Sequence, residues 1–408
     1  MLSIRYMGSK RNLAKTVADA LCSIGTGYCV DLFSGMCSVA ATLADKRHVI
    51  TNDIQTFAAL TAQTYIATPE EPPKSNIIDK IRELYLANYQ LLNERFGHLI
   101  EQEKYWLYQA SLDEWEGYAE WCKTVPHTGN NLLLRREVLS LRGKEHVPYR
   151  LFSLTFPNSY FGLKQCLEID SLRFAIDYAV KKDIISIAES RWVLVALMQA
   201  LSHTSSSPGH FAEFFEVKDK RTFELVRKLR TRNIIQQTML ELDRIIPAGS
   251  PNWRSGNLVF NEDSLNMLER LRNIQNIGCV YADPPYTNAQ YSRYYHLLET
   301  LVRYDYPESN FKGRYRSDRY MAPFCRKTQV LFAFNQLARM VSQLNVPLLL
   351  SYPSTGLLYQ TGYSPEDVLK KYFANVKIIY DGHNEHSTFG ASSGYAKVAV
   401  KEYLFLAY

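Results

Sequence analysis

The chain has 408 residues, of which 46% are hydrophobic, and a formal net charge of +6. This composition argues against disorder and leaves room for two domains, and the mild positive charge permits an anionic partner such as nucleic acid. No run approaches the roughly 18 apolar residues of a membrane helix, and the first residues lack the apolar region of a secretory signal. Seven scattered cysteines without a C-x-x-C pair favour reduced thiols over disulfides or zinc, so we expect a cytoplasmic protein with no membrane contact.

The first 68 residues alternate short apolar runs with helical patterns. Residues 28–31 form an apolar run that ends in Asp31, residues 48–53 form a second run that ends in Asp53, and residues 57–67 have a helical pattern. A β–α–β–α order of this kind is typical of a parallel sheet covered by helices.

Residues 69–249 have a different character, because helical patterns dominate there. A proline-rich break at residues 68–73 precedes them, and a second break lies at residues 247–251. The expected helices cover residues 76–96, 98–122, 171–201 and a basic stretch from 222 to 238. We interpret residues 69–249 as a mostly helical insert.

Strand patterns return after residue 250. The expected strands cover residues 258–260, 279–282, 347–352, 376–380 and 398–407, and the expected helices cover residues 264–272, 291–304 and 329–343. The simplest architecture is an α/β domain whose single sheet is built from residues 1–68 and 250–408.

The turn after the first expected strand has the features of a cofactor site. Asp31-Leu32-Phe33-Ser34-Gly35 provides a turn in which Gly35 lets the backbone approach a ligand, and Asp53 at the next strand end can accept hydrogen bonds from ribose hydroxyls. Met36 and Cys37 stand where a pyrophosphate-binding loop would have further glycines, which disfavours a nicotinamide cofactor. The pattern favours a cofactor with adenosine but without phosphates, such as S-adenosylmethionine. The alternative is an ordinary tight βα connection.

The tetrapeptide Asp283-Pro284-Pro285-Tyr286 follows a buried strand, at the sheet edge where open α/β sheets bind ligands. Two prolines fix the backbone and remove two donors, which leaves the Asp283 carboxylate and the Pro284 carbonyl as rigid acceptors for an amino group. Tyr286 offers a ring on which a base could stack. This arrangement points to methylation of an exocyclic amino nitrogen. The alternative is a Pro-Pro turn that only ends a strand.

Together these motifs resemble the DNA adenine-N6 methyltransferases of the Dam-like, or D12, class. The resemblance covers residues 1–68 and 250–300, with a weaker tail over residues 346–408. It implies a Rossmann-like methyltransferase sheet, mostly parallel with an antiparallel C-terminal strand, and S-adenosyl-L-methionine as the cofactor. It also implies transfer of a methyl group to N6 of a flipped adenine in double-stranded DNA. The catalytic residues would then be Asp283, Pro284, Pro285 and Tyr286.

The resemblance also assigns roles around the cofactor. Tyr6 would pack on the cofactor, Lys10 would contact its methionyl end or nearby acids, and Asp263 would face its adenine. Cys37 replaces the family's second glycine in the turn after the first strand. The implied cofactor site consists of Tyr6, Lys10, Asp31, Phe33, Gly35, Asp53, Asp263 and Asp283.

Three further segments are similar to modification methyltransferases of restriction systems rather than to the housekeeping enzyme. They are residues 209–212, 291–300 and 386–390. We therefore expect a site-specific enzyme of a restriction-modification or defence system, with a cognate partner. The roles of His210 and His386 are open, and nothing in the chemistry calls for a metal.

The insert, residues 69–249, is where the resemblance places a target-recognition domain. Two basic segments are candidates for contacts with the DNA backbone, although each could also be a solvated charged face. The candidate contact residues are Lys220 and Arg221 in one segment and Arg314, Arg316 and Arg319 in the other. Tyr160 and Phe161, or Tyr291, could line the space that a flipped base leaves.

Other functions remain open at this point. The same chemistry could act on RNA or on cytosine N4, and the chain could be a catalytically silent nucleic-acid-binding module on the same fold. A nicotinamide dehydrogenase is disfavoured by the turn after Asp31.

Overall fold

The computed structural model describes residues 13–387 and 397–408. The described residues divide into two compact units. The sheet unit comprises residues 13–69, Ala248–Ser292 and Tyr320–Tyr408, and the helical unit comprises Glu70–Pro247 and Arg293–Arg319. Among these residues, every helix is too short or too polar to cross a membrane.

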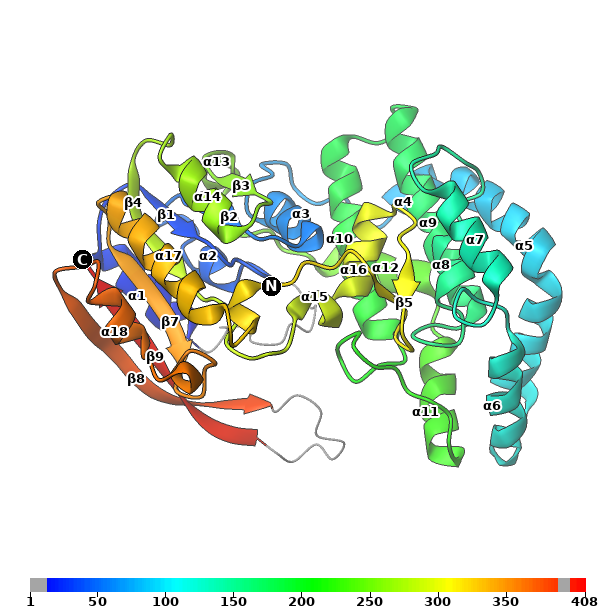
Figure 1. Ribbon diagram of the computed structural model, residues 1–408. Helices are drawn as coiled ribbons and strands as arrows, with labels where there is room; N and C mark the ends of the chain where they lie inside the picture. Colours follow the sequence, from blue (N-terminus) through cyan, green and yellow to red (C-terminus); the bar gives the residue numbers. More distant parts are fainter. Residues whose placement is uncertain (1–12, 388–396) are drawn as a thin grey trace. The chain divides into compact units, whose positions relative to one another are not determined.

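The sheet unit is built on a seven-stranded sheet with the order β3-β2-β1-β4-β7-β9-β8 (Figure 1). The first five strands in this order pair in parallel, and β9 runs antiparallel to both β7 and β8. This confirms the expected α/β class, a mostly parallel sheet with an antiparallel C-terminal strand. The strands are β1 (Tyr28–Asp31), β2 (Val49–Asn52), β3 (Leu258–Phe260), β4 (Ile277–Ala282), β7 (Leu348–Pro353), β8 (Val376–Ser387) and β9 (Lys397–Ala407).

The hydrophobic core of this unit forms where helices α14 and α17 pack on the central strands. Val30 of β1 and Val280 of β4 are fully buried together with Met267 of α14 and Leu337 of α17. The strands are apolar on both faces, as expected for a parallel sheet covered by helices. The helices of the unit are α1 (Ala14–Ser23), α2 (Ser38–Thr42), α3 (Thr56–Tyr65), α13 (Pro251–Ser255), α14 (Ser264–Leu271), α17 (Val330–Gln343) and α18 (Pro365–Leu369), and α15 (Tyr291–Tyr294) spans the boundary between the units.

The helical unit contains the expected helices of the insert and a short hairpin. The hairpin strands β5 (Ser309–Asn310) and β6 (Tyr315–Arg316) pair antiparallel. The helices are α4 (Ile77–Lys80), α5 (Arg82–Lys104), α6 (Trp115–Thr124), α7 (Leu132–Leu141), α8 (Leu151–Thr155), α9 (Leu163–Lys181), α10 (Ile187–Thr204), α11 (Lys220–Arg230), α12 (Ile234–Arg244) and α16 (His296–Arg303).

Several stretches that the sequence predicts as single helices are interrupted: 76–96 is divided between α4 and α5, 98–122 between α5 and α6, and 291–304 between α15 and α16. Two further stretches show the local cause. The stretch 171–201 is divided between α9 and α10, because Asp183 adopts a left-handed φ of 55° and the Ser186 hydroxyl caps α10 at the N–H of Glu189. The basic stretch is divided between α11 and α12, where the Asn233 side chain accepts a hydrogen bond from Gln236 N. In both cases a side-chain N-cap begins a new helix within the predicted stretch.

Arg293–Arg319 groups with the helical unit, although the sequence predicts residues 250–408 as one portion. Five residues of α16, including His296 and Leu301, are buried. The His296 Nε2 atom lies 3.0 Å from the carbonyl oxygen of Phe211, and Phe211 N donates a hydrogen bond to the Tyr294 carbonyl. The segments 209–212 and 291–300 thus contact each other.

Candidate active site

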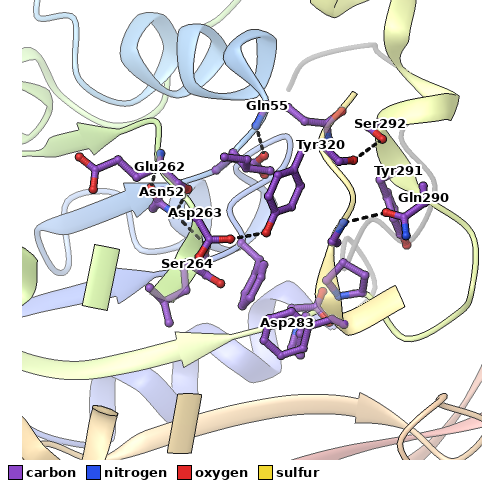
Figure 2. A pocket seen from close by; sticks show the side chains of 18 of the residues that line it. Asn52, Gln55, Glu262, Asp263, Ser264, Asp283, Gln290, Tyr291, Ser292 and Tyr320 are labelled. Atoms are coloured by element: carbon purple, nitrogen blue, oxygen red, sulfur yellow. Dashed lines mark hydrogen bonds between the residues drawn. The ribbon is translucent and has the colours of Figure 1, made fainter. Parts of the chain in front are cut away.

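A pocket of the sheet unit lies where β1, β2, β3 and β4 end at their carboxyl termini (Figure 2). The residues that follow each of these strands contribute to its wall, as expected for parallel strands that end at the same edge. From these four strand ends the lining residues are Leu32, Phe33, Asn52, Asp53, Ile54, Gln55, Glu262, Asp263, Ser264, Asp283, Pro284, Pro285 and Tyr286.

The turn after β1 is tied directly to Asp53. Gly35 adopts a left-handed φ of 47°, and its N–H donates a hydrogen bond to Asp53 Oδ2 at 3.0 Å. The other oxygen of this carboxylate accepts a hydrogen bond from Gln55 N at 2.9 Å. Cys37 also adopts a left-handed conformation, with φ 59°, at the position of the family's second glycine. The loop therefore keeps a glycine-type backbone at Cys37 at some cost in strain.

Asp31 ends β1 beside other acids and is only 2% exposed. Burial, reinforced by the charge of Asp283, raises the pKa of Asp31 to about 8. Its Oδ1 atom is buried and accepts no hydrogen bond from the described residues. This carboxyl group is thus a buried acceptor that a cationic group would stabilise in its charged form.

Asn52 holds the ends of three neighbouring strands together. Its side-chain nitrogen donates hydrogen bonds to the carbonyl oxygens of Leu32 and Glu262, at 3.3 and 3.0 Å. Its side-chain oxygen accepts a hydrogen bond from Glu262 N at 3.1 Å. The residue beside Asp53 therefore has a structural role, since it fixes the loops from which the pocket is built.

Asp263 is held in place from two sides. Its Oδ1 accepts a hydrogen bond from Leu265 N at 2.9 Å at the start of α14, and its Oδ2 accepts one from the Tyr320 hydroxyl. Figure 2 shows the Tyr320 ring directed toward this carboxylate. Burial, together with the hydrogen bond to Asp263, raises the pKa of Tyr320 well above its usual value. Tyr320 therefore stays a neutral donor.

The tetrapeptide 283–286 lines the pocket directly after the buried strand β4. Pro284 is buried, while Asp283 and Tyr286 are half-buried. The carbonyl of Tyr286 accepts a hydrogen bond from Leu357 N at 2.8 Å, which ties the end of the tetrapeptide to the segment after β7. The structure thus brings together at one pocket the four strand-end motifs that the sequence predicts.

Several further residues line the pocket without a role assigned from the sequence, and three of them make contacts that fix its wall. Phe324 contacts Phe33 edge to face with ring centroids 5.5 Å apart, and Gln290 Oε1 accepts a hydrogen bond from Ala322 N. Tyr320 is the third. No sequence signal marks them, because all three lie outside the four strand-end motifs, Gln290 and Tyr320 in irregular segments and Phe324 in a short 3₁₀ helix.

The positions of two implied cofactor residues lie outside the described part of the chain. They are Tyr6 and Lys10. The side chain of His386 also lies outside the described side chains. Among the described residues, no group of three or more histidine, cysteine, aspartate or glutamate residues is arranged to hold a metal ion.

Three of the candidate DNA-contacting residues are accessible in the helical unit. Lys220 and Arg221 are exposed at the start of α11, where Lys220 pairs with Asp113. Arg319 is half-buried, donates a hydrogen bond to the carbonyl of Arg316 and lies 5.0 Å from the centroid of the Tyr315 ring.

Arg316 does not meet the expectation of a DNA contact. Its side chain is 2% exposed, and its guanidinium makes paired contacts with Asp305 at 2.7 and 2.8 Å and with Asp318 at 2.9 and 3.1 Å. This guanidinium uses four of its five N–H donors on two carboxylates, and its burial keeps it away from a phosphate at the surface. Arg316 therefore stabilises the segment after α16.

Arg314 is not a surface contact either, because it is only 7% exposed. It donates hydrogen bonds to the carbonyl oxygens of Thr155 and Pro157. Tyr160 and Phe161 are fully buried as well, so neither is available at the surface to replace a base.

A mostly parallel α/β sheet with a D-P-P-Y tetrapeptide at its carboxyl edge is the arrangement of one class of protein, the Rossmann-like methyltransferases. The chain belongs to the family of D12 class N6 adenine-specific DNA methyltransferases, whose model matches residues 6–125 and 248–345. The family resemblance stated from the motifs is thereby confirmed.

The chain is also similar to known modification enzymes. It is 23% identical over 357 residues to the modification methylase LlaI of Lactococcus lactis subsp. lactis, and 30% identical over 216 residues to the type II methyltransferase M.FokI of Planomicrobium okeanokoites. It is 21% identical over 378 residues to the modification methylase StsI of Streptococcus sanguinis. These alignments cover 87%, 52% and 90% of this chain but only 47%, 29% and 46% of the relatives, so the chain spans at most about half of their length.

Proposed function

We propose that this chain is a site-specific DNA methyltransferase that transfers a methyl group from S-adenosyl-L-methionine to N6 of an adenine in duplex DNA. The observation that carries the proposal is the convergence of Asp53, Asp263 and the tetrapeptide 283–286 on one pocket. Membership in the D12 family supports N6 of adenine over cytosine N4 or RNA. The names of the relatives support a role as the modification enzyme of a restriction system, with a cognate partner.

The residues of the pocket fit S-adenosyl-L-methionine. Asp53, 8% exposed, suits two ribose hydroxyls, and Asp263 suits the amino group of the cofactor's adenine. The rings of Phe33 and Phe324 suit the apolar faces of that base, and the buried Oδ1 of Asp31 suits the cationic methionyl end. Gly35 lets the loop approach, and we propose Tyr6 and Lys10 as further contacts. When bound, the cofactor supplies an electrophilic methyl group.

The tetrapeptide would make adenine N6 reactive. This nitrogen is a poor nucleophile because its lone pair is delocalised into the ring. The Asp283 carboxylate and the Pro284 carbonyl accept its two hydrogens, which favours a pyramidal nitrogen and orients the lone pair. The Asp283 carboxylate would accept the proton that N6 loses when it takes up the methyl group that the cofactor supplies. Pro285 keeps the segment rigid, and Tyr286 stacks on the base.

The target base has to leave the duplex to reach a pocket at a sheet edge, which costs a few kcal/mol. We propose that the helical unit contacts the duplex and selects the target sequence. Lys220, Arg221 and Arg319 remain the proposed phosphate contacts, because their side chains are at least partly accessible.

Transfer of a labelled methyl group tests this proposal. The purified chain is incubated with labelled S-adenosyl-L-methionine and either mixed-sequence duplex DNA or structured RNA, and the product nucleosides are separated by mass. We expect label in N6-methyladenine from DNA. Label only in RNA or in N4-methylcytosine would contradict the proposal, and tight DNA binding without any transfer would favour the silent binding module. Base-modification sequencing of DNA from cells that express the chain would then reveal the target sequence.

A further inference from the structure

Apart from the pocket of the sheet unit, the helical unit has a cavity of its own, of about 500 Å³, that the proposed chemistry does not use. Its wall is formed by helix α6, the loop around His127, the segment around Phe214, Arg230 at the end of α11 and the tip of the β5–β6 hairpin. This volume is within the range of roughly 300–1,000 Å³ that is typical of small-ligand pockets.

Two buried arginines line this cavity, Arg230 at 4% and Arg314 at 7% exposure. Arg230 donates hydrogen bonds to the Tyr118 hydroxyl at 2.6 Å and to Asn158 Oδ1 at 2.9 Å, and Arg314 donates to backbone carbonyls. Neither guanidinium forms an ion pair with a carboxylate in residues 13–387 or 397–408. The Arg230 Nε atom is buried and has no hydrogen-bond partner among them.

The positive charge of this pair is incompletely compensated. Burial lowers the pKa of Arg314 to about 10, and the charge of Arg230 acts in the same direction. Burial also acts to lower the pKa of Arg230, but Tyr118, Cys122 and the buried Glu103 raise it on balance, although Glu103 accepts its hydrogen bonds from the N–H groups of Leu163 and Lys164. Arg314 lacks a neighbouring carboxylate of this kind in the described part of the chain, and a buried charge without a counter-ion is costly, so an anion in the cavity would be stabilised.

Lysines surround the same cavity. Lys123, Lys218 and Lys312 line it, with side chains 70%, 72% and 71% exposed. Glu216 is the single carboxylate among the lining residues that the structure describes, and it pairs with Lys312 at 2.6 Å and with Lys218 at 3.6 Å. The cavity is therefore strongly positive.

An exposed aromatic ring stands beside this charge. Phe311, at the tip of the hairpin, is 76% exposed and has a left-handed φ of 63°, which is rare for a bulky side chain. Phe214 and Phe215 are half-buried in the wall of the cavity. A cationic groove with accessible rings is the combination by which proteins bind nucleic-acid strands.

We propose that this cavity binds a phosphate of the DNA backbone, with Arg230 and Arg314 as its floor, Lys218 and Lys312 at its rim, and Phe311 stacked on a neighbouring base. The inference rests on the proposed function, because it takes DNA as the ligand. The cavity would be a second DNA-contacting region of the helical unit, and Arg314 would contact a phosphate inside the cavity and not at the surface.

Exposed residues allow a test that leaves the fold intact. The full chain and the variants Lys312→Gln and Phe311→Ala are titrated with a fluorescent duplex at several salt concentrations. Lys370→Gln and Phe332→Ala serve as matched controls, because Lys370 is 61% exposed and paired with Glu366 at 2.6 Å, and Phe332 is 63% exposed on α17. We expect Lys312→Gln to weaken binding severalfold and to reduce the slope of log K against log salt by about 1. Phe311→Ala should weaken binding about tenfold without changing the slope.

The outcomes separate this inference from the proposed function. If both variants bind DNA like the controls, the inference is wrong even when the wild-type chain methylates DNA. If the wild-type chain methylates no nucleic acid but both variants lose DNA affinity, the site stands and the proposed function fails. Binding of adenosine monophosphate that depends on Lys312, with DNA binding unaffected, would identify a free-nucleotide site and overturn the inference. Cofactor affinity should be the same in all four variants.

Discussion

The hydroxyl of Tyr320 donates a hydrogen bond to Asp263 Oδ2, although 57 positions separate the two residues in the sequence. Because Leu265 N holds the other oxygen, the carboxylate of Asp263 has one fixed orientation at the pocket wall. An acceptor that is already oriented loses little entropy when it binds a ligand amino group.

Replacing Tyr320 by Phe should therefore weaken cofactor binding without changing the chemistry. The variant keeps the ring but loses one hydrogen bond, worth about 1 kcal/mol, or roughly a fivefold rise in the dissociation constant. Calorimetric titration with S-adenosyl-L-methionine measures this constant, and kcat at saturating cofactor should be unchanged. Tyr363→Phe is the control, since Tyr363 is 41% exposed and does not line the pocket. An equal loss of affinity in the control would rule out a specific role for Tyr320.

Replacing Asp283 by Ala should reduce methyl transfer by roughly 100- to 1,000-fold, because the target amino group loses a charged acceptor. Cofactor affinity should change much less, since Asp53 and Asp263 remain. Asp283→Asn keeps a carbonyl oxygen and should fall between Ala and the wild type. Single-turnover assays with saturating DNA measure the rate. A variant Asp283→Ala with an almost normal rate would exclude this residue from catalysis.

Replacing Asp31 by Asn should stabilise the cofactor-free protein in a pH-dependent way. The pKa of Asp31 is raised from 3.8 to about 8, so the folded state holds a proton that the unfolded state releases above pH 4. The wild-type carboxyl group therefore makes the protein less stable as pH rises from about 4 to 8. The neutral amide carries no such penalty, so the gain in Tm should be larger at pH 8 than at pH 5. Equal gains at both values, measured by thermal denaturation, would contradict the assignment.

Replacing Arg316 by Met should lower the free energy of unfolding and leave the DNA contacts intact. Loss of the buried partner of Asp305 and Asp318 should cost about 3 kcal/mol of stability. The salt dependence of DNA binding should stay at the wild-type slope, in contrast to Lys312→Gln. Denaturant titration and the fluorescence binding assay measure the two quantities. An unchanged stability with a lower salt slope would restore Arg316 as a phosphate contact.

Much of the sheet and its motifs could be predicted because their signals are local. Asp31, Asp53 and Asp283 each end a short apolar run, and the strands β1, β2 and β4 occupy those runs. Parallel strands share one carboxyl edge, so the amino-acid sequence alone is enough to assign three separate acids to one edge of the sheet, where Asp53 and Asp283 line the pocket and Asp31 is buried. The positions of Gly35 and the tetrapeptide follow from the same reasoning.

Other features depend on partners distant in the sequence. Tyr320 and Gln290 reach the pocket from irregular segments, and Phe324 reaches it from a 3₁₀ helix of three residues, which is too short for a hydrophobic period. Arg316 resembles its neighbours in a basic stretch, and only its position between Asp305 and Asp318 shows that its charge is neutralised inside the fold. The break between α9 and α10 depends on one left-handed residue, Asp183, within an otherwise continuous apolar pattern.

The sequence by itself determined the class of the sheet, the edge at which its functional residues meet and the tetrapeptide that points to amino-group chemistry. These properties follow from the spacing of apolar residues and from the backbone restrictions of proline and glycine, which act over a few residues. Only the tertiary structure decided which cations are free and which are paired, what holds Asp263 in place, and that Arg230 and Arg314 line one cavity. Burial and ion pairing depend on the packing of segments far apart in the chain, which no local pattern encodes.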